Sequence, residues 1–547
     1  MRRGLLLRTV SLLTAAVLLL FAAPPAFPAA AEAVIPDVPQ VIITTDDGVG
    51  AELVKDDGYV TAKIMIYGTD GSIITDSGKI KVRGNSTAKG KKKPYTVKFD
   101  SKHDVEGMGA AKKWVLLADF YDPTLLRNYT VFTLAEQLGM PYTPAHCFAE
   151  VTLDGKKLGC YEICTPVDVH KYRVDLDLAA GDFLVMFEKK REKEGVSYIL
   201  ANGRKAYRFA VEAPEEPTEE QLAHIQEVMN TAVTAMAKKD YAALQELIDI
   251  PSFAKLYVIN EYVKDVDFCF SSVYYYYKGG RLYAGPVWDF DLSCGNENCE
   301  VQHRYEYFMY PTGIVQSNMQ LYHYLSAIPE FAAEVRKAYC ENWRLFYELG
   351  ADGGVIETGY EANAAVFARN FKLWRVSKLQ SNLMRRPDAT YALNLEFFRQ
   401  WCAAREAWLS DYYGASEYGR PLTGDVDANG AVEMADAVLL AQINAEQTDM
   451  LPEDPLIRAD LNFDRVLSAA DLGALLRILF PPQDIPDVPA NPDNPDDPDN
   501  PGDPADTGDT GDSDTSGNSG DSSDSDAPDI LGGSDGPGTG GTDVHAS

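Results

Sequence analysis

Four carboxylates stand in two pairs whose spacing suits metal or acid–base chemistry. "DVDF" places Asp265 and Asp267 at the end of an expected helix, and "GPVWDFDLSCGN" places Asp289 and Asp291 just after an expected strand. In an extended chain the second pair would share one face, and the neighbouring aromatic residues would take the other. Acids this close repel unless a divalent cation or strong donors neutralise them. We therefore expect a metal or acid–base site; solvated acids in a turn are the simpler alternative.

A basic turn upstream supplies the opposite charge. "KVRGNSTAKGKKKPYTVKF" places Arg83 and Gly84 in a turn of small polar residues, with Lys93 and Lys98 on the following strand. Backbone amides in such a turn can approach an anion, to which Arg and Lys add charge. Alone, the turn fits an ordinary basic hairpin. Together with the acids it predicts an anion cradle beside a metal platform, which nucleotide-dependent phosphoryl transfer needs.

The elements that must position these residues change type along the chain. Short apolar or alternating runs predict strands in the first part, with a hairpin around Asp154 and Gly155. Between them lies a helical pattern that begins at Asp122, a suitable capping residue. From Glu216 onward helical periodicity dominates. We therefore expect an α+β body of two lobes over residues 38–415.

A second candidate metal centre follows the body as an internal repeat. Each copy carries oxygen-bearing side chains at loop positions 1, 3, 5, 9 and 12, followed by an amphipathic helix. The residues are Asp425, Asp427, Asn429, Glu433 and Asp436 in the first copy, and Asp460, Asn462, Asp464, Ser468 and Asp471 in the second. This spacing wraps a loop around one hard cation, and calcium suits it better than magnesium. The alternative is a pair of polar turns before helices that bind no metal, which would explain one copy of the repeat but hardly two.

The sixth position distinguishes the two copies of this repeat. The first copy has Gly430 there, whereas the second has Arg465. Glycine adopts the sharp turn without strain, and arginine does so less readily. We therefore expect weaker calcium binding in the second loop.

The beginning of the chain predicts export. Residues 1–33 contain three early arginines, an apolar run and small residues suited to cleavage, which together are typical of a secretory signal peptide. The apolar run from Val10 to Ala23 is shorter than the about 20 residues that a membrane span needs. We therefore expect a secreted, extracellular protein without a membrane span.

The end of the chain is acidic and of low complexity. Residues 483–547 hold 17 acidic residues and no Lys or Arg, so removing them takes the formal charge from −32 to −15. This composition buries little apolar surface and predicts a disordered tail. The remaining body is still acidic, which argues against nucleic acid as a partner.

Eight cysteines occur in the chain, an even number that permits disulfides after export. Two pairs are close in sequence, Cys160 with Cys164 and Cys294 with Cys299. Their spacings do not match the usual zinc patterns, and few histidines lie nearby. We expect structural thiols, paired or free, rather than a zinc site.

The loop–helix repeat resembles a type I dockerin over residues 420–482. Such modules bind calcium and attach secreted proteins to the cohesin domains of a scaffoldin in cellulosomes. The resemblance implies calcium as a cofactor, a cohesin as a partner, and a setting of polysaccharide degradation. It does not indicate the chemistry of the body.

The body resembles the spore coat protein H (CotH) kinase family. "RGNST…KKPYTVKF", "KWVLLADFYDPTLLRN", "LGMPYTPAHCFAEVTLDGKKLGCYEI", "VKDVDFCFSSVYYYYKGG" and "GPVWDFD" recur in that order in the family. The resemblance spans roughly residues 60–300. It implies an atypical, secreted, protein-kinase-like fold that uses ATP and magnesium or manganese to phosphorylate Ser or Thr of exported proteins.

The resemblance also assigns roles to individual residues. Asp267 stands where the family has its catalytic-loop aspartate, which orients or deprotonates the acceptor hydroxyl. Lys98, or failing it Lys93, is expected to reach the ATP phosphates with help from Arg83.

The metal ligands implied by the resemblance come from both acidic segments. Asp291 is the first candidate ligand for magnesium or manganese and Asp289 the second. Many members of the family supply a further ligand through an Asn five or six residues after the catalytic aspartate. This chain has Ser272 and Val273 in that region, and a hydroxyl is a poorer ligand than an amide oxygen.

Three functions follow from these patterns. The first is a secreted Ser/Thr kinase attached to a cellulosome-type scaffold. The second is an inactive kinase-like component that binds or supports such an assembly. The third is a carbohydrate-active enzyme, which paired acids and aromatic residues also permit; the separation of Asp289 and Asp291 by one residue argues against it.

Overall fold

The computed structural model describes residues 35–481, with gaps at residues 51, 188–194, 200–204, 270, 298–309, 317–320, 380, 382 and 449–450. The predicted signal peptide and the predicted tail therefore lie outside the described residues. None of the helices in the described part is both long and apolar enough to cross a membrane.

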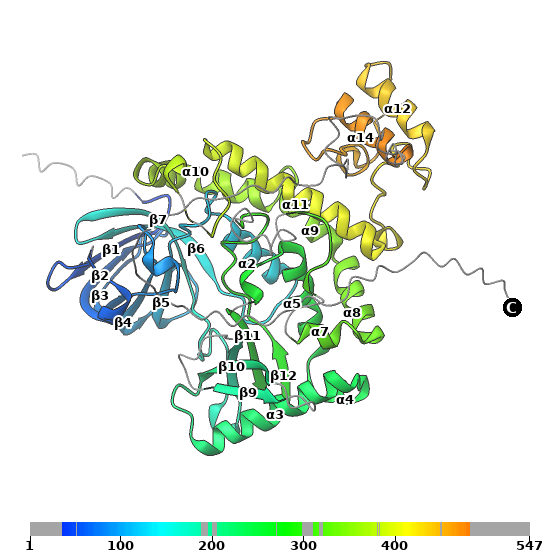
Figure 1. The fold of residues 1–547 in the computed structure, drawn as a ribbon. Coiled ribbons are helices and arrows are strands. Elements are labelled where there is room, and N and C mark those ends of the chain that lie inside the picture. Colours follow the sequence, from blue (N-terminus) through cyan, green and yellow to red (C-terminus); the bar gives the residue numbers. More distant parts are fainter. Residues whose placement is uncertain are drawn as a thin grey trace, which may run out of the picture. The chain divides into compact units, whose positions relative to one another are not determined.

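Seven strands form a closed barrel in the order β1-β2-β3-β4-β5-β7-β6 (Figure 1). They are β1 (Gln40–Thr45), β2 (Val60–Tyr67), β3 (Ile73–Val82), β4 (Tyr95–His103), β5 (Ala111–Leu117), β6 (His146–Leu153) and β7 (Lys156–Cys164). Parallel pairing of β1 with β6 closes the barrel. Alternate residues of β2, namely Ala62, Ile64 and Ile66, are buried in one core cluster with Trp114. The alternation in the sequence thus produces an apolar barrel interior.

A second sheet of five antiparallel strands follows the order β12-β11-β8-β10-β9. Its strands are β8 (Phe183–Phe187), β9 (Gly195–Ile199), β10 (Lys205–Ala213), β11 (Val273–Lys278) and β12 (Arg281–Ala284). In the described part of the chain, one α-helix precedes all five strands, and three more precede β11 and β12, so the body is a mixed α+β fold with strands in both halves. The N-terminal part is nevertheless strand-rich and the C-terminal part helical, as the sequence predicts.

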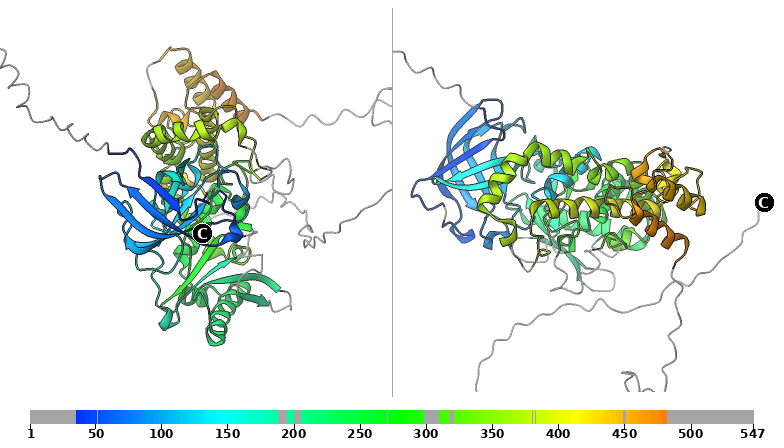
Figure 2. Two further views of the ribbon diagram at one scale, coloured as in Figure 1. Left: turned by 90° about the vertical axis from the view of Figure 1, so that its left-hand side faces the viewer. Right: turned by 90° about the horizontal axis from the view of Figure 1, so that it is seen from above.

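Helices pack against both sheets. They are α2 (Arg127–Gln137), α3 (Glu219–Lys238), α4 (Tyr241–Leu247), α5 (Ile250–Val263), α7 (Tyr322–Leu325), α8 (Pro329–Cys340), α9 (Trp343–Gly350), α10 (Val355–Leu373) and α11 (Tyr391–Tyr413). Helix α3 packs against β9 and α5 against β12, whereas α10 packs against β7 of the barrel (Figure 2). Helix α5 is buried almost all round, and its end therefore has a fixed position.

The C-terminal repeat forms α12 (Met434–Asn444), α13 (Pro455–Arg458) and α14 (Ala469–Leu479). Helices α12 and α14 pack together over a small separate core that includes Val426, Leu440 and Leu475. The predicted loop–helix order is therefore confirmed over the described residues.

Two local expectations need correction. Helix α2 begins at Arg127 rather than at Asp122, because the Asp122 carboxylate accepts the backbone N–H of Arg127 and caps the helix from five residues upstream. The segment after β12 is not extended either. Asp289 has φ 70°, in the left-handed region, so simple alternation does not describe residues 285–291.

Candidate active site

The two acidic segments meet at the end of helix α5. The helix stops at Lys264, which has φ 49° and places Asp265 and Asp267 just beyond the last turn. The second segment is tied to this end because the Cys294 N–H donates to the Val263 carbonyl over 2.7 Å. This backbone contact holds the segment containing Asp289 and Asp291 beside the first pair.

Burial divides the four acids into two kinds. Asp265 and Asp291 are buried, whereas Asp267 and Asp289 retain partial exposure. Burial and the neighbouring charge of Asp289 raise the pKa of Asp267 to about 7. Burial, followed by repulsion from Asp289 and Asp267, raises the pKa of Asp291 well above its usual range. Binding of a divalent cation at these acids would therefore be coupled to release of protons.

Asp289 is fixed by a serine and lies near an arginine. Ser272 has φ 67°, and its hydroxyl donates to Asp289 Oδ2 over 3.2 Å. Burial raises the pKa of Asp289, and the positive charge of Arg83 opposes that rise. The Arg83 guanidinium lies 5.0 Å from the centre of the Trp288 ring. The basic turn and the acidic segment predicted from the sequence therefore come together.

The lysines behave differently from the sequence prediction. Lys98 is exposed on the outer face of β4, between the buried Val97 and Phe99, so the structure does not bring it to the acids. Lys93 precedes the strand, and its Nζ donates to the Leu53 carbonyl over 2.5 Å. The side chain that turns inward is that of Lys92, which is 2% exposed.

Lys92 extends the cluster into the barrel. Its Nζ donates to the carbonyls of Ala118 and Cys160, and burial lowers its pKa to about 8 although the nearby charges of Cys160 and Asp119 raise it. Burial raises the pKa of Asp119, while the Asn128 hydrogen bond and the charge of Lys92 lower it. Lys92 is thus a second cation of the site that the sequence does not single out.

Helix α2 holds the acidic segment in place through its first turn. Asn128 donates to Asp119 Oδ1 over 2.9 Å, and its own Oδ1 accepts the Phe290 N–H over 2.7 Å. The neighbouring Arg127 donates to the Ser293 carbonyl and pairs with Asp122 over 2.5 Å. Arg127 and Asp122 therefore form a buried structural pair that also positions the site.

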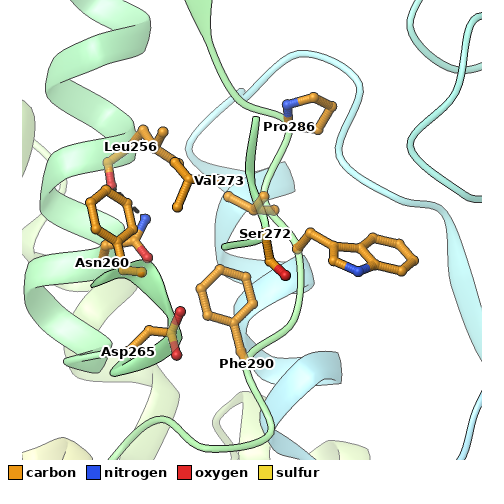
Figure 3. Close-up of a pocket in the computed structure, with 10 residues that line it drawn as sticks. Leu256, Asn260, Asp265, Ser272, Val273, Pro286 and Phe290 are labelled. Atoms are coloured by element: carbon orange, nitrogen blue, oxygen red, sulfur yellow. Dashed lines mark hydrogen bonds between the residues drawn. The ribbon is translucent and has the colours of Figure 1, made fainter. Parts of the chain in front are cut away.

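The cavity beside the acids is too small for a substrate. Asn260, Asp265 and Ser272 line it with apolar side chains (Figure 3), and its volume is about 10 Å³. That is room for roughly one water molecule. This cavity therefore has no room for a nucleotide.

Three further polar residues adjoin the acids and escape sequence reasoning. Burial raises the pKa of Tyr121, and so do the charges of Asp291 and Asp267. Burial, and then Asp267, raises the pKa of Glu297 to about 8. Asn296 donates to the Asp291 carbonyl over 2.7 Å. The run "CGNE", which overlaps the end of the motif "GPVWDFDLSCGN", was the available signal for Asn296 and Glu297.

The acids fit a cation that shares its ligands with a substrate. In the described part of the chain, three carboxylate oxygens approach within 4.8 Å of one another only in the two C-terminal loops. The acids of the body are spaced more widely. Mg²⁺ commonly takes one or two carboxylates and completes its shell with water and phosphate oxygens. Asp289 and Asp291 suit that mode of binding.

Buried acids beside a basic turn, at the junction of two sheets and a buried helix, form an arrangement that suits nucleotide-dependent phosphoryl transfer. Residues 80–349 match the family model described as CotH kinase protein. The resemblance of the body is therefore supported over that range, and the match suggests an atypical kinase-like protein. No curated protein matches the chain.

The C-terminal loops gather carboxylates as the repeat predicts. Asp425, Asp427 and Asp436 come together in the first loop, and Asp460, Asp464 and Asp471 in the second. Glu433 Oε1 accepts a hydrogen bond from Asn429 over 3.3 Å, whereas the Ser468 hydroxyl accepts the Ala470 N–H and caps α14. Asn429 donates to the carboxylate of Asp427, and Asn462 donates to that of Asp464. Each loop thus presents three acidic oxygens to one small volume.

Arg465 keeps the turn that glycine makes in the first loop. Its backbone N–H donates to Asp460 Oδ2 over 2.8 Å, as that of Gly430 donates to Asp425 over 3.1 Å. Its φ is 63°. The guanidinium pairs with Asp352 and Glu396 at 3.1 and 2.5 Å. These ion pairs offset the backbone strain expected for arginine at this position.

The cysteines form no metal cluster among the described residues. Cys160 and Cys164 lie on β7 and are buried and free. Cys294 is also buried and free, while Cys299 lies outside the described residues. Cys160, Cys164 and Cys294 therefore form no disulfide in the described part of the chain.

Raised pKa values predict how stability depends on pH in the metal-free protein. Asp267 has an ordinary pKa of 3.8 that burial raises to about 7. The folded state therefore binds this proton more tightly than the unfolded state does, and stability falls as pH rises between those values. Urea unfolding from pH 5 to 8 should show the fall, and added Mg²⁺ should reduce it. Asp267→Asn should flatten the dependence; a slope equal to that of the wild type would contradict this origin.

Proposed function

We propose that residues 38–415 transfer the γ-phosphate of ATP to Ser or Thr of an exported protein. The observation that supports this function is that the partly exposed side chains of Asp267, Asp289 and Arg83 lie near one another. The acceptor oxygen forms a bond to the γ-phosphorus as the bond to the bridging oxygen of ADP breaks, and Asp267 receives the hydroxyl proton.

Each remaining group has a separate task in this proposal. Asp291 and Asp289 hold magnesium or manganese, which would neutralise charge on the phosphates. Arg83 contacts phosphate oxygens from the basic turn. Lys92 replaces Lys98 and Lys93 as the buried cation, and acts through Asp119 rather than by direct contact. Asn128 keeps the acidic segment at a fixed distance from the barrel.

The experiment that tests this function is metal-dependent ATP binding followed by transfer. The purified full-length chain should show a thermal shift with ATP and Mn²⁺ that exceeds the shift with either alone. It should also label itself or a Ser/Thr-rich exported protein from γ-labelled ATP. Binding without labelling would favour the inactive kinase-like component, for which Ser272 in place of the usual Asn is the supporting observation. Absence of binding would overturn the kinase proposal.

We further propose that residues 420–482 are a dockerin that binds calcium and a cohesin domain of a scaffoldin. Two clusters of three carboxylates at matching loop positions support this, as does the packing of α12 on α14 over a separate core. Export through the predicted signal peptide would place the protein outside the cell, in a cellulosome-type assembly or at the cell surface.

Calcium removal should abolish cohesin capture without unfolding the body. Filling each loop with calcium neutralises three acids that repel one another, so metal binding and loop order are coupled. Capture by a type I cohesin, measured by surface plasmon resonance, should disappear with chelator and return with Ca²⁺. Asp436→Ala should lower it by at least about tenfold. The exposed Asp411→Ala serves as control; capture that survives chelator would contradict the dockerin proposal.

A further inference from the structure

Asn296 is a buried amide that bridges the acidic segment and the barrel. Its side chain is 1% exposed. Its Nδ2 donates to the carbonyls of Tyr121 and Asp291, each over 2.7 Å. Its backbone carbonyl accepts the Arg385 N–H over 2.6 Å. The residue is therefore held from both its main chain and its amide nitrogen, and its orientation is fixed.

The amide oxygen of Asn296 has no hydrogen-bond partner. Oδ1 is buried and accepts no bond from any described residue. Both donors of the amide are engaged, so exchanging its oxygen and nitrogen would place an acceptor against two carbonyls. A buried acceptor without a donor costs about 1–3 kcal/mol. The structure therefore keeps an unsatisfied oxygen at this place.

Asn296 belongs to the acidic segment of the site. Its Nδ2 donates to the backbone carbonyl of Asp291, and Glu297 is the next residue in the chain. Its other acceptor is the backbone carbonyl of Tyr121, and the charges of Asp291 and Asp267 raise the pKa of the Tyr121 side chain. Hard divalent cations take oxygen ligands, including the amide oxygen of Asn. A neutral amide oxygen suits such a site because it adds a ligand without adding repulsion.

We propose that Asn296 Oδ1 is a ligand of the divalent cation that Asp291 binds, and that it supplies the amide oxygen missing at Ser272. This inference rests on the metal site of the proposed function. The amide oxygen would then come from a different position in the chain. Asn296 follows Asp291, whereas the Asn of other family members precedes the equivalent aspartate. The hydroxyl of Ser272 remains bonded to Asp289.

The test measures Mn²⁺ binding by electron paramagnetic resonance, without ATP. All proteins are full-length and carry Asp425→Ala and Asp460→Ala, so that the C-terminal loops contribute no signal. Asn296→Ala should weaken Mn²⁺ binding by about tenfold or more. Asn296→Asp keeps the oxygen but loses both amide donors, and should bind Mn²⁺ at least as tightly as the unmutated site.

The aspartate variant separates a ligand from a structural residue. If Asn296 acts only through its donors, Asn296→Asp must be as weak as Asn296→Ala, and that result overturns the proposal. Unchanged binding in Asn296→Ala also overturns it. Asn394→Ala is the matched control: Asn394 is equally buried, but both its oxygen and its nitrogen are hydrogen-bonded. Its loss should leave Mn²⁺ affinity unchanged.

A measurement on the unmutated site guards against variants that do not fold. With ¹³C-labelled asparagine, bound Mn²⁺ should show ¹³C hyperfine coupling, and its absence overturns the assignment. Failure of the proposed function is distinguishable from failure of this inference. A site that binds no Mn²⁺ removes both, whereas Mn²⁺ binding that ignores Asn296 removes only the second. Binding through Asn296 without phosphoryl transfer supports the ligand and contradicts the kinase.

Discussion

Asp291→Ala is expected to abolish both metal-dependent ATP binding and phosphoryl transfer. Asp291 is buried beside Asp289 and Asp267, so its carboxylate becomes favourable only when a cation neutralises it. Loss of this ligand should weaken Mn²⁺–ATP binding by about 100-fold or more. The measurement is isothermal titration with Mn²⁺–ATP, together with labelling from γ-labelled ATP.

Asp267→Asn should give a different result and serves as the matched comparison. The new asparagine has nearly the same shape as the aspartate that it replaces. Asp267 lies in the same cluster as Asp291, but its proposed task is to receive a proton from the acceptor hydroxyl. It should retain ATP binding while transfer falls by about 10²–10⁴-fold. If both variants lost ATP binding equally, the division into a metal ligand and a base would be wrong. If Asp291→Ala kept full activity, the metal site would lie elsewhere.

Arg405→Met is expected to cause the largest loss of stability in the body. Arg405 and Glu261 are fully buried and pair over 2.6 Å. The arginine also donates to the carbonyls of Pro311 and Gly313, and Glu261 accepts the N–H of Val315. Removing the guanidinium leaves a buried carboxylate uncompensated, which costs about 3–5 kcal/mol. The change should appear as a lower midpoint in urea unfolding.

Two companion variants define the cause. Glu261→Gln in the Arg405→Met background removes the uncompensated charge and should recover part of the stability. Arg281→Met breaks an exposed pair with Glu246 at 3.9 Å and should cost less than about 1 kcal/mol. Equal effects of Arg405→Met and Arg281→Met would show that the buried pair contributes nothing special. Because Glu261 lies on α5, which ends just before Asp265, the loss should also lower metal binding.

The sequence by itself determined much of the candidate site. The acids Asp265, Asp267, Asp289 and Asp291 were identified, and so was the turn at Arg83, because motif chemistry is local and survives without knowledge of packing. The same holds for the loop repeat, because the spacing within one short loop determines which carboxylates come close enough to bind one cation. Strand alternation likewise predicted the strand-rich N-terminal part, since a period of two reports directly on which face is buried.

Only the tertiary structure decided which lysine turns inward and what holds the acids in place. Lys92 and Lys93 precede strand β4, so the alternation of buried and exposed residues along a strand cannot predict which of the two side chains is buried. The contact of Arg127 with Ser293 and that of Asn128 with Phe290 span more than 160 residues, and pattern reasoning has no access to such pairs. The unpartnered oxygen of Asn296 likewise becomes evident only in the tertiary structure. An orphaned oxygen exists only once folding has removed water and placed every other donor elsewhere.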